Sequence, residues 1–404
     1  MLRIVNKKKR VIAGILDRIG CLLCKPVLSF SVQKHDRCQV RKILAIRFAY
    51  LGDVILTVPA IKPLKDRFPE SSICFLVGSG ARQVLENNPF VDEIITYDPP
   101  WFYPRRNLSC ILDYVRLVRL IRSKGFDTVI DFRGDLRNIL FVVLPSGACR
   151  RVGSAMTGGG YVLTKSVPWT QKKHKVEFHL GLARALGVNT NTPGPMTLYP
   201  DGEDRARVQG LLQEMNIRDG DFLAGLHPGG RVDLKNWDIA CYAEVADVLA
   251  KRYDAKILIT GGADEVTLGE AVLRSMKGEG FNLCGKLSLK QLQVLLEEMS
   301  LFVTNDTGPL HIASGANVPT VAIFGPSEVW DTGPLSQHHR VVMKDLPCRA
   351  ACDTYTCRNK DYHECLKSIK PAEVLAACAE VLEAVKKRPQ PNKSALAWQA
   401  LGGS

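Results

Sequence analysis

The stretch KILAIRFAYLGD at residues 42–53 is an apolar run that turns through a glycine into a helix-like run. The stretch LFVTNDTGPLH at residues 301–311 repeats this arrangement in the other half of the chain. A strand that turns tightly into a helix aims backbone N–H groups and the positive end of the helix dipole at one point in space. Two such turns in one chain predict an enzyme that works in a cleft between two α/β domains.

Strand and helix signals alternate along both halves. The first half has strand signals at 42–46, 72–77, 91–96 and 127–132, and helix signals at 54–68, 113–123 and 136–143. The second half has strand signals at 222–226, 256–260, 301–304 and 320–324, and helix signals at 237–252, 289–299 and 310–316. This alternation is typical of an α/β fold in which helices cover both faces of a parallel sheet.

Composition shifts predict the domain boundaries. The segment NTNTPGPMTLYP at 189–200 is rich in residues that interrupt helices and strands, so we expect the interdomain linker there. The expected parts are an N-terminal extension, a first domain, a linker, a second domain and a flexible tail, at 1–40, 41–190, 191–204, 205–387 and 388–404.

The overall charge favours acidic partners. The chain has 404 residues, with 54 Lys and Arg against 41 Asp and Glu, and a net charge of +13. Such a balance suits nucleic acid, an anionic membrane surface or phosphorylated substrates. The sequence has none of the common nucleic-acid-binding signatures, so we expect no nucleic-acid partner. A generally basic soluble protein is the plain alternative. The 13 cysteines, without a credible export signal, indicate mainly reduced thiols in the cytoplasm.

The first residues combine a basic run with an amphipathic pattern. KKKR at 7–10 precedes apolar residues at helical spacing between 11 and 23, and the sequence has no apolar stretch long enough to span a membrane. We expect a basic amphipathic helix that lies on an anionic membrane. The alternative is a helix that packs on the protein's own surface.

Two groups in the first half could act on a substrate. Asp53 follows Gly52 at the mouth of the first turn, where a carboxylate can accept a proton from a hydroxyl. It could instead simply cap the helix that follows. Arg133 and Arg137 follow the strand at 127–132, and guanidinium groups bind acidic groups in two-pronged fashion. A solvated charge cluster is the alternative for these arginines.

The second half carries the features of a phosphate site. Asp306, Thr307 and Gly308 stand at the second turn, where backbone amides and the Thr307 hydroxyl suit a diphosphate. His311 lies one helical turn further on and could reach the same anion. Lys235, in the loop HPGGRVDLKNW at 227–237, could neutralise a leaving phosphate. This loop lacks the spacing GxxxxGK[ST], which argues against a P-loop ATPase, and no GxGxxG follows the opening strand of the chain, which argues against a nicotinamide enzyme.

A cysteine group near the end leaves three interpretations open. Cys348, Cys352, Cys357 and Cys365, with His363, lack the CxxC pair typical of structural zinc. They could bind a metal, pair as disulfides or remain a thiol-rich loop.

Three blocks together resemble glycosyltransferase family 9, the heptosyltransferases of lipopolysaccharide core assembly. The first block is IRFAYLGDVILTVP at 46–59, and the second is HPGG at 227–230 with KNW at 235–237. The third is NDTGPLHIAS at 305–314, which continues to PTVAIFGP at 319–326. The order and spacing of the blocks match, and the resemblance covers roughly residues 41–385.

The resemblance implies a GT-B architecture, in which two Rossmann-like domains face each other across a cleft. It implies that the first domain takes the acceptor and the second the nucleotide sugar. The implied reaction is an inverting transfer of heptose from ADP-heptose, with neither a metal nor another cofactor. The implied acceptor is an acidic lipopolysaccharide core, and the implied location is the cytoplasmic face of the inner membrane, as a peripheral protein.

The resemblance also implies roles for individual residues. Asp53 would be the general base, and Lys235 would stabilise the departing ADP. The donor would be bound by His227, Gly229, Gly230, Asp264, Glu265, Asp306, Thr307, Gly308, Pro309, Leu310 and His311. Among these, Asp306 would place the sugar, and Asp264 or Glu265 would contact the ribose. Arg47, Arg133 and Arg137 would face the acceptor.

Two departures from the family pattern concern the membrane and the acceptor. About 40 residues precede the family's usual first strand, and Phe48-Ala49-Tyr50 replaces small polar residues in the first loop. Two alternative functions therefore remain open at this point. One is a GT-B transferase that uses another nucleotide sugar in envelope polysaccharide assembly, and the other is a non-catalytic, membrane-associated scaffold.

Overall fold

The computed structural model describes residues 14, 17, 19–22, 39–103, 109–169, 172–350, 352 and 355–386. The chain divides into two compact units, residues 1–199 and 200–404, so the division falls within the segment 191–204. No helix within the described ranges is both long and apolar enough to cross a membrane. The tail at 388–404 lies outside the described residues.

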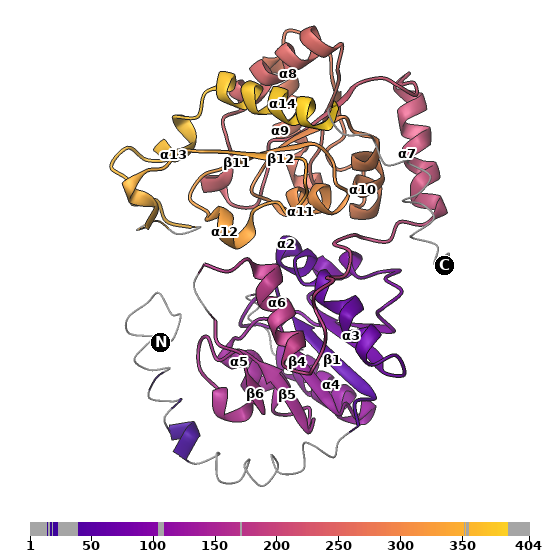
Figure 1. Ribbon diagram of the computed structural model, residues 1–404, viewed down its shortest axis with the longest axis vertical. Coiled ribbons are helices and arrows are strands. Elements are labelled where there is room, and N and C mark those ends of the chain that lie inside the picture. The colour runs from indigo at the N-terminus through magenta and orange to yellow at the C-terminus, as the bar shows by residue number, and fades with distance from the viewer. Residues whose placement is uncertain are drawn as a thin grey trace. The chain divides into compact units, whose positions relative to one another are not determined.

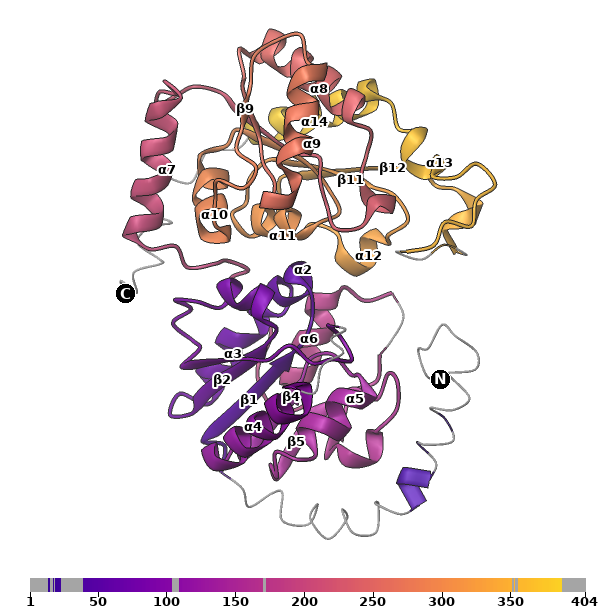
Figure 2. The ribbon, with the colours of Figure 1, turned by 180° about the vertical axis from the view of Figure 1, so that it is seen from behind.

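The first unit is built on a parallel sheet with strand order β3-β2-β1-β4-β5-β6. Its strands are β1 (Lys42–Arg47), β2 (Ser72–Val77), β3 (Glu93–Thr96), β4 (Thr128–Asp131), β5 (Arg150–Gly153) and β6 (Lys165–Ser166). Its helices are α2 (Leu51–Ile55), α3 (Ile61–Arg67), α4 (Ser109–Lys124), α5 (Leu136–Asn138) and α6 (Lys175–Arg184). Helix α6 lies in front of the sheet in Figure 1 and α4 lies in front of it in Figure 2, so these helices cover opposite faces.

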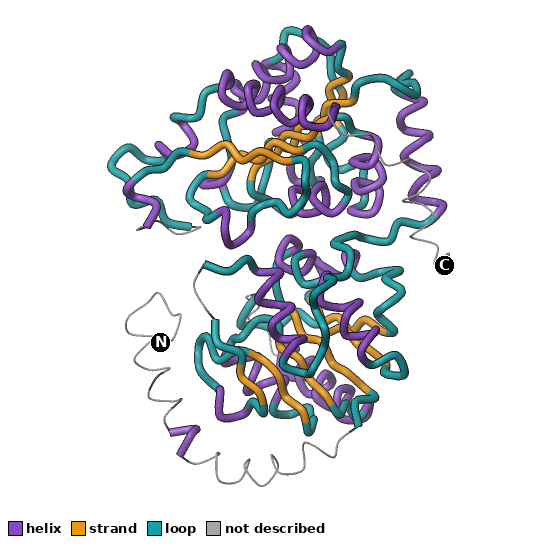
Figure 3. The backbone as a smooth tube through the Cα atoms, in the orientation of Figure 1, coloured by secondary structure: helices purple, strands orange, loops and turns teal. Residues whose placement is uncertain are grey.

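The second unit repeats this plan with strand order β12-β11-β10-β7-β8-β9. Its strands are β7 (Leu223–His227), β8 (Lys256–Ile259), β9 (Phe281–Asn282), β10 (Leu301–Asn305), β11 (Thr320–Phe324) and β12 (His339–Met343). Its helices are α7 (Gly202–Glu214), α8 (Ile239–Tyr253), α9 (Val266–Ser275), α10 (Leu289–Glu298), α11 (Gly308–Gly315), α12 (Val329–Thr332), α13 (Glu364–Lys367) and α14 (Pro371–Lys386). Figure 3 shows the strands of this unit between helices on either side.

Both sheets follow the Rossmann strand order. Numbered within its own unit, each reads 3-2-1-4-5-6, the order of a doubly wound dinucleotide-binding fold. The central strands are largely apolar because both faces are covered: β1 is buried from its second residue, and all of β10 is buried. The predicted α/β class with two Rossmann-like domains is therefore confirmed.

Two predicted helices are interrupted. The helix predicted at 54–68 is wrong as a single element, because α2 ends at Ile55 and a 3₁₀ turn at Val58–Ala60 precedes α3. Pro59 within that turn has no N–H to donate, which breaks an α-helix. The helix predicted at 136–143 is α5 followed by a π-helical turn at Ile139–Val143.

Two further predictions concern the N-terminal helix and the state of the cysteines. Within the predicted N-terminal helix, the described residues are helical, and Asp17 accepts a hydrogen bond from the Gly159 N–H at 2.6 Å. Ile19 and Leu22 of the same segment remain exposed. The other residues of that helix lie outside the described ranges. Ten cysteines of the described residues are free thiols, in line with the expectation of mainly reduced thiols, and Cys149 is disulfide-bonded.

Candidate functional site

The predicted site residues of each unit lie where its strand order reverses. In the first unit Arg47 is the last residue of β1, Asp53 follows in α2, and Arg133 follows the neighbouring β4. In the second unit His227 is the last residue of β7 and the segment 228–230 follows it, while the segment 306–308 follows β10, which pairs with β7. Open α/β sheets bind ligands beyond the carboxyl ends of strands at this reversal point. Each unit therefore has its own candidate binding site.

Asp53 is held by two cations. Its Oδ1 lies 3.0 Å from the Lys175 ammonium and 3.3 Å from Nη2 of Arg47. Arg47 is buried and also donates through Nη1 to the Phe132 carbonyl at 2.5 Å. The N-cap position of α2 belongs to Tyr50, and Asp53 lies inside the first turn. The capping alternative for Asp53 therefore does not describe its geometry.

The two cations set the charge state of Asp53. Burial by itself raises the pKa of this carboxyl, but the charges of Lys175 and Arg47 outweigh burial and hold the pKa well below its ordinary range. Asp53 is consequently ionised at neutral pH. Its side chain keeps 28% of its surface exposed, so a substrate hydroxyl can reach it.

Asp53 opens into a cavity of about 220 Å³ in the first unit. Its lining includes Arg47, Arg133, Lys175 and His179, so cations outnumber carboxylates around Asp53. Burial holds the pKa of His179 well below its ordinary value, and its Nδ1 lies 2.8 Å from the Leu56 carbonyl. His179 is therefore neutral at pH 7, and Nδ1 carries the proton because it faces an acceptor.

The two predicted acceptor arginines after β4 have different surroundings. Arg133 donates to the Phe48 carbonyl at 2.6 Å and places its guanidinium over the Phe102 ring, and it lines the cavity. Arg137 binds both oxygens of Asp135, at 2.9 Å and 2.6 Å. Arg137 therefore forms a two-pronged pair within the protein, whereas Arg133 faces the space beside Asp53.

The buried carboxyl group of Asp131 holds the loop that follows β4. Asp131 ends β4 and accepts hydrogen bonds from the backbone N–H groups of Gly134 at 2.9 Å and Arg133 at 3.3 Å. Burial raises the pKa of Asp131 to about 6, against the effect of these hydrogen bonds. The protonation state of Asp131 therefore changes within the pH range in which proteins are commonly studied.

In the second unit Lys235 and Asp306 form a close ion pair. Lys235 Nζ lies 2.6 Å from Asp306 Oδ2, and the Asp306 side chain is 4% exposed. Burial raises the pKa of Asp306, but the Lys235 charge outweighs burial and lowers it. The sequence assigned these residues separate roles and did not predict that they pair.

A buried asparagine holds the loops of this site together. Asn305, at the end of β10, donates to the Pro228 carbonyl at 2.7 Å and accepts from the Trp237 N–H at 3.2 Å. It also accepts from the Tyr242 hydroxyl at 3.0 Å. Asn305 therefore fixes both ends of the loop that carries Lys235, a role that sequence reasoning missed.

Helix α11 begins beside the Lys235–Asp306 pair. Thr307 is its N-cap residue, with extended backbone, and Pro309 lies in its first turn, where a missing N–H costs nothing. Gly308 opens the helix, and Leu310 is fully buried. His311 is buried one turn later and contributes to the lowered pKa of Asp306, so it lies near that carboxylate.

Two glycines after β7 allow other groups to approach the backbone. A Cβ atom on Gly229 would collide with the Glu265 carboxylate, and one on Gly230, at φ +157°, would lie 2.7 Å from Thr307 Cγ2. Glu265 accepts from the Gly262 N–H at 2.7 Å and raises the pKa of buried His227, which burial lowers more strongly. Glu265 thus joins the site, whereas Asp264 is exposed.

The cysteine-rich segment backs the loop that carries Lys235. Cys348, Cys352, Cys357 and Cys365 are free thiols that line one small cavity with His363. His363 Nε2 lies 2.8 Å from the carbonyl of Leu234, next to Lys235. Among the described residues, no group of three or more His, Cys, Asp or Glu side chains is placed to hold a metal ion.

Sequence reasoning missed Lys175 and His179 on α6. The only local signal for Lys175 is the basic run KKHK at 172–175, and a basic run usually marks a solvated surface. Its contact with Asp53 spans more than a hundred residues of chain and depends on how α6 packs.

Two Rossmann-like units, each with charged residues at its strand-order reversal, define the GT-B class of α/β proteins. The match to the family model for glycosyltransferase family 9 (heptosyltransferase) spans residues 114–363, more than half of the chain. This protein belongs to that family.

Individual relatives agree with this assignment. Lipopolysaccharide heptosyltransferase 2 of Salmonella typhimurium is 26% identical over 352 residues, which is 83% of this chain and 96% of the relative. Lipooligosaccharide heptosyltransferase 2 of Campylobacter jejuni is 33% identical over 171 residues, or 41% of this chain, and the match spans only 53% of that relative's length. The structure of Escherichia coli ADP-heptose lipopolysaccharide heptosyltransferase II has the same fold, with a TM-score of 0.69 and 22% identity, over 85% of this chain and 99% of that one.

Proposed function

We propose that this protein transfers a heptose from ADP-heptose to a lipopolysaccharide core, with inversion at the sugar carbon and without a metal ion. The observation that carries the proposal is the Lys235–Asp306 pair, 2.6 Å apart, at the start of α11. It puts an ammonium and the amide end of a helix in one small region, as a leaving diphosphate requires. Membership of the family supports heptose as the transferred sugar.

The donor would be bound in the second unit. Backbone amides at Thr307 and Gly308 and the Lys235 ammonium would hold the two phosphates of ADP. Glu265, which lies against Gly229, would accept hydrogen bonds from the ribose hydroxyls. Asp306 would then accept from hydroxyls of the heptose, and it stays ionised because Lys235 lowers its pKa.

Transfer would proceed in one displacement. The acceptor hydroxyl oxygen attacks the anomeric carbon, and the bond from that carbon to the diphosphate oxygen breaks with its electron pair leaving on ADP. The hydroxyl proton passes to Asp53. A carboxylate with a pKa this low is a weak base for a free hydroxyl, so the proton would move late, once the forming C–O bond has made it strongly acidic.

The acceptor would be an acidic glycolipid. Arg47, Arg133 and Lys175 around the Asp53 cavity suit its phosphate or carboxylate groups. Because such an acceptor is anchored in lipid, we also propose that the protein works as a peripheral protein on the anionic cytoplasmic face of the inner membrane. The net charge of +13 favours that surface.

Calorimetric titration of the full-length protein with ADP, UDP, GDP and CDP in EDTA tests the donor assignment. The proposal predicts binding of ADP in preference to the other three. Preference for another nucleotide would move the protein to a different donor sugar. If none of the four bound, the non-catalytic scaffold would become the better account.

A further inference from the structure

Helix α4 presents an unusual face to solvent. Two of its residues, Leu117 and Ile121, are buried against the sheet. The outward side of a surface helix is ordinarily polar. On α4, however, Ile111 and Leu112 are 63% and 60% exposed, and two further aliphatic residues, Val115 and Leu120, are exposed as well.

The apolar surface continues onto the neighbouring π-helical turn. Phe141 is 44% exposed and packs edge-on against Tyr114 of α4, with ring centroids 6.1 Å apart. Leu144 is also exposed, and Arg122 of α4 donates to the adjacent Pro145 carbonyl at 2.9 Å. We call these exposed residues of α4 and of the adjoining turn the α4 face, whose large apolar members are Ile111, Leu112, Val115, Leu120, Phe141 and Leu144.

The charges between these apolar residues have one dominant sign. Arg116, Arg119 and Arg122 are exposed on α4, and Lys124 follows at its end, whereas Asp113 is the one acidic residue of the helix. Asp113 is already paired with Arg116 at 3.3 Å. A partner for this face must therefore offer both an apolar layer and negative charge.

We infer that the α4 face docks on a lipid bilayer that carries anionic headgroups. A bilayer interface supplies hydrocarbon just below a layer of phosphates, and helices that lie in it combine aliphatic and basic residues in this way. Arginine reaches the headgroups while its methylene stem stays in the apolar layer. The inference rests on the peripheral location proposed above and assigns that location a folded surface, distinct from the segment before residue 39.

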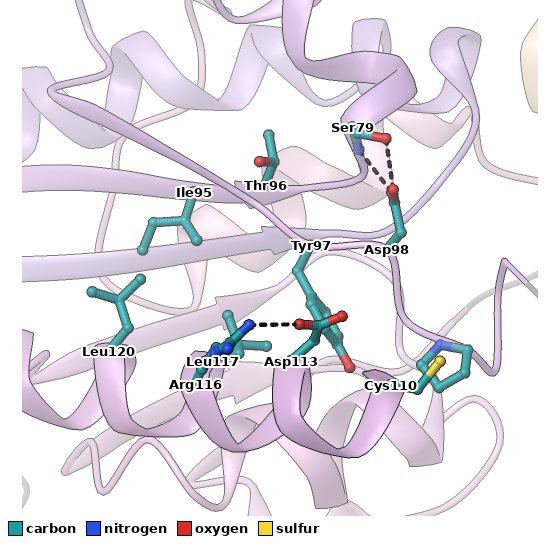
Figure 4. A pocket seen from close by; sticks show the side chains of 11 residues that line it. Ser79, Ile95, Thr96, Tyr97, Asp98, Cys110, Asp113, Arg116, Leu117 and Leu120 are labelled. Atoms are coloured by element: carbon teal, nitrogen blue, oxygen red, sulfur yellow. Dashed lines mark hydrogen bonds and ion pairs between the residues drawn. The ribbon is translucent and has the colours of Figure 1, made fainter. Parts of the chain in front are cut away.

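The flank of α4 that faces β3 marks one edge of this surface. There, Asp113, Arg116, Leu117 and Leu120 line a cavity of about 350 Å³ together with residues after β2 and β3 (Figure 4). The other carboxylate that lines this cavity belongs to Asp98, which accepts hydrogen bonds from the N–H and the hydroxyl of Ser79 at 2.8 and 2.7 Å. Because this flank carries both signs of charge, the attraction to anionic lipid comes from the side with Arg119 and Arg122.

Vesicle sedimentation of the full-length protein tests the inference. Vesicles of phosphatidylcholine alone are compared with vesicles that also contain phosphatidylglycerol, at low and high salt. The wild-type protein is expected to bind the anionic vesicles more tightly. Arg119→Gln is expected to weaken that binding about fivefold at low salt. The double variant Ile111→Gln/Leu112→Gln is expected to weaken it about tenfold for each side chain withdrawn from the apolar layer.

Matched controls lie in the second unit. Leu335 is 50% exposed, and the Arg274 side chain is 69% exposed and paired with an acidic residue of its own helix, as Arg116 is. Leu335→Gln and Arg274→Gln are expected to bind vesicles like the wild-type protein. All variants are expected to bind ADP unchanged.

Three results would overturn the inference. If the wild-type protein binds anionic vesicles and the α4 variants bind them equally well, another segment makes the contact. If the wild-type protein is a dimer that the α4 variants dissociate, the face is an interface between two copies of the chain. If the wild-type protein binds no vesicles, both the α4 assignment and the peripheral location are wrong. ADP binding, measured in the same samples, shows separately whether the donor site of the proposed transferase is intact.

Discussion

The ammonium of Lys175 lies 3.0 Å from the carboxylate of Asp53. The two residues come from α6 and α2, so the packing of the first unit, and not local sequence, sets the charge state of the proposed base. The carboxylate is fully ionised but weakly basic as a result. This pairing makes the chemistry at Asp53 open to direct tests.

Replacing Asp53 by Asn should abolish transfer while leaving the donor site intact. Loss of a general base costs about 10²- to 10⁴-fold in kcat. Steady-state kinetics give the loss, and calorimetry should find ADP affinity unchanged. Asp66→Asn, at an exposed aspartate of α3 paired with Lys62, is the matched control and should retain full activity. Normal turnover by Asp53→Asn would remove the base assignment.

Removing Lys175 should shift the pH dependence of transfer. Lys175 is the strongest of the charges that lower the pKa of Asp53, so Lys175→Met should raise that pKa. Because the base acts in its ionised form, the acid limb of kcat/KM should move to higher pH. Lys175→Arg keeps the charge and should restore the wild-type limb. An unmoved limb in Lys175→Met would show that another group controls it.

Single substitutions of Lys235 and of Asp306 should affect ADP affinity and kcat differently. Lys235→Met removes a charged hydrogen-bond donor, which typically costs about 1.5–3 kcal/mol, so ADP affinity should fall about 10- to 100-fold. Asp306→Asn removes the negative charge that lies 2.6 Å from the ammonium, so ADP should bind at least as tightly while kcat with ADP-heptose falls.

Calorimetry and initial rates on these two variants provide the check. Lys251→Met, at an exposed lysine of α8, is the control and should change neither quantity. Equal losses of ADP affinity in Lys235→Met and Asp306→Asn would argue that the pair is only structural.

Gly229→Ala should lower ADP affinity by displacing the carboxylate of Glu265. The added methyl group would occupy the position of the Glu265 carboxylate, a flexible end that can move away, so the fold should survive while ADP affinity falls. In a Glu265→Ala background the same substitution should cost little, because the displaced group is already gone. Calorimetry on the four proteins of this cycle measures the coupling. Gly210→Ala in α7 is the control, since a Cβ there meets no atom of the described residues within 4 Å. Additive losses would show that Gly229→Ala does not act through Glu265.

Asp131 should make the first unit less stable as pH rises. Its pKa is about 6 in the folded protein and about 3.9 in an unfolded chain. Between these values the folded state holds the extra proton, so the free energy of unfolding falls with rising pH, by about 3 kcal/mol in total. The effect is complete above the folded pKa.

Chemical denaturation over the pH range from below the unfolded pKa to above the folded pKa measures this loss, with hydrogen exchange of β4 peptides identifying the first unit's transition. Asp131→Asn cannot ionise, so its stability should be flatter over the same range, whatever its absolute value. An equal slope in both proteins would assign the pH dependence to another group.

The sequence predicts the central strands because their burial leaves a plain signal. The predicted strands at 72–77 and 320–324 match β2 and β11 to the residue, since in each a single polar residue is followed by an unbroken apolar run. β5 and β12, with sequences RRVG and HRVVM, were not predicted, because charged residues interrupt their short apolar pattern.

The motif residues of the site could be found in the sequence, but their partners could not. Asp53 and Asp306 stand at recognisable strand–helix turns. Their contacts with Lys175 and Lys235 join segments far apart in the chain, and the role of Asn305 depends on two loops meeting above one strand end. Tertiary packing creates these relationships, so no local pattern carries them.

Heptose transfer itself can be measured by incubating the full-length protein in EDTA with ADP-heptose and a lipopolysaccharide core acceptor, followed by mass spectrometry of the acceptor. The account predicts that the acceptor gains one heptosyl unit and that an equal amount of ADP is released. With Asp53→Asn we expect both products to form about 10²- to 10⁴-fold more slowly, although ADP still binds. An unchanged acceptor with the wild-type protein, under conditions in which ADP-heptose binds, would contradict the account.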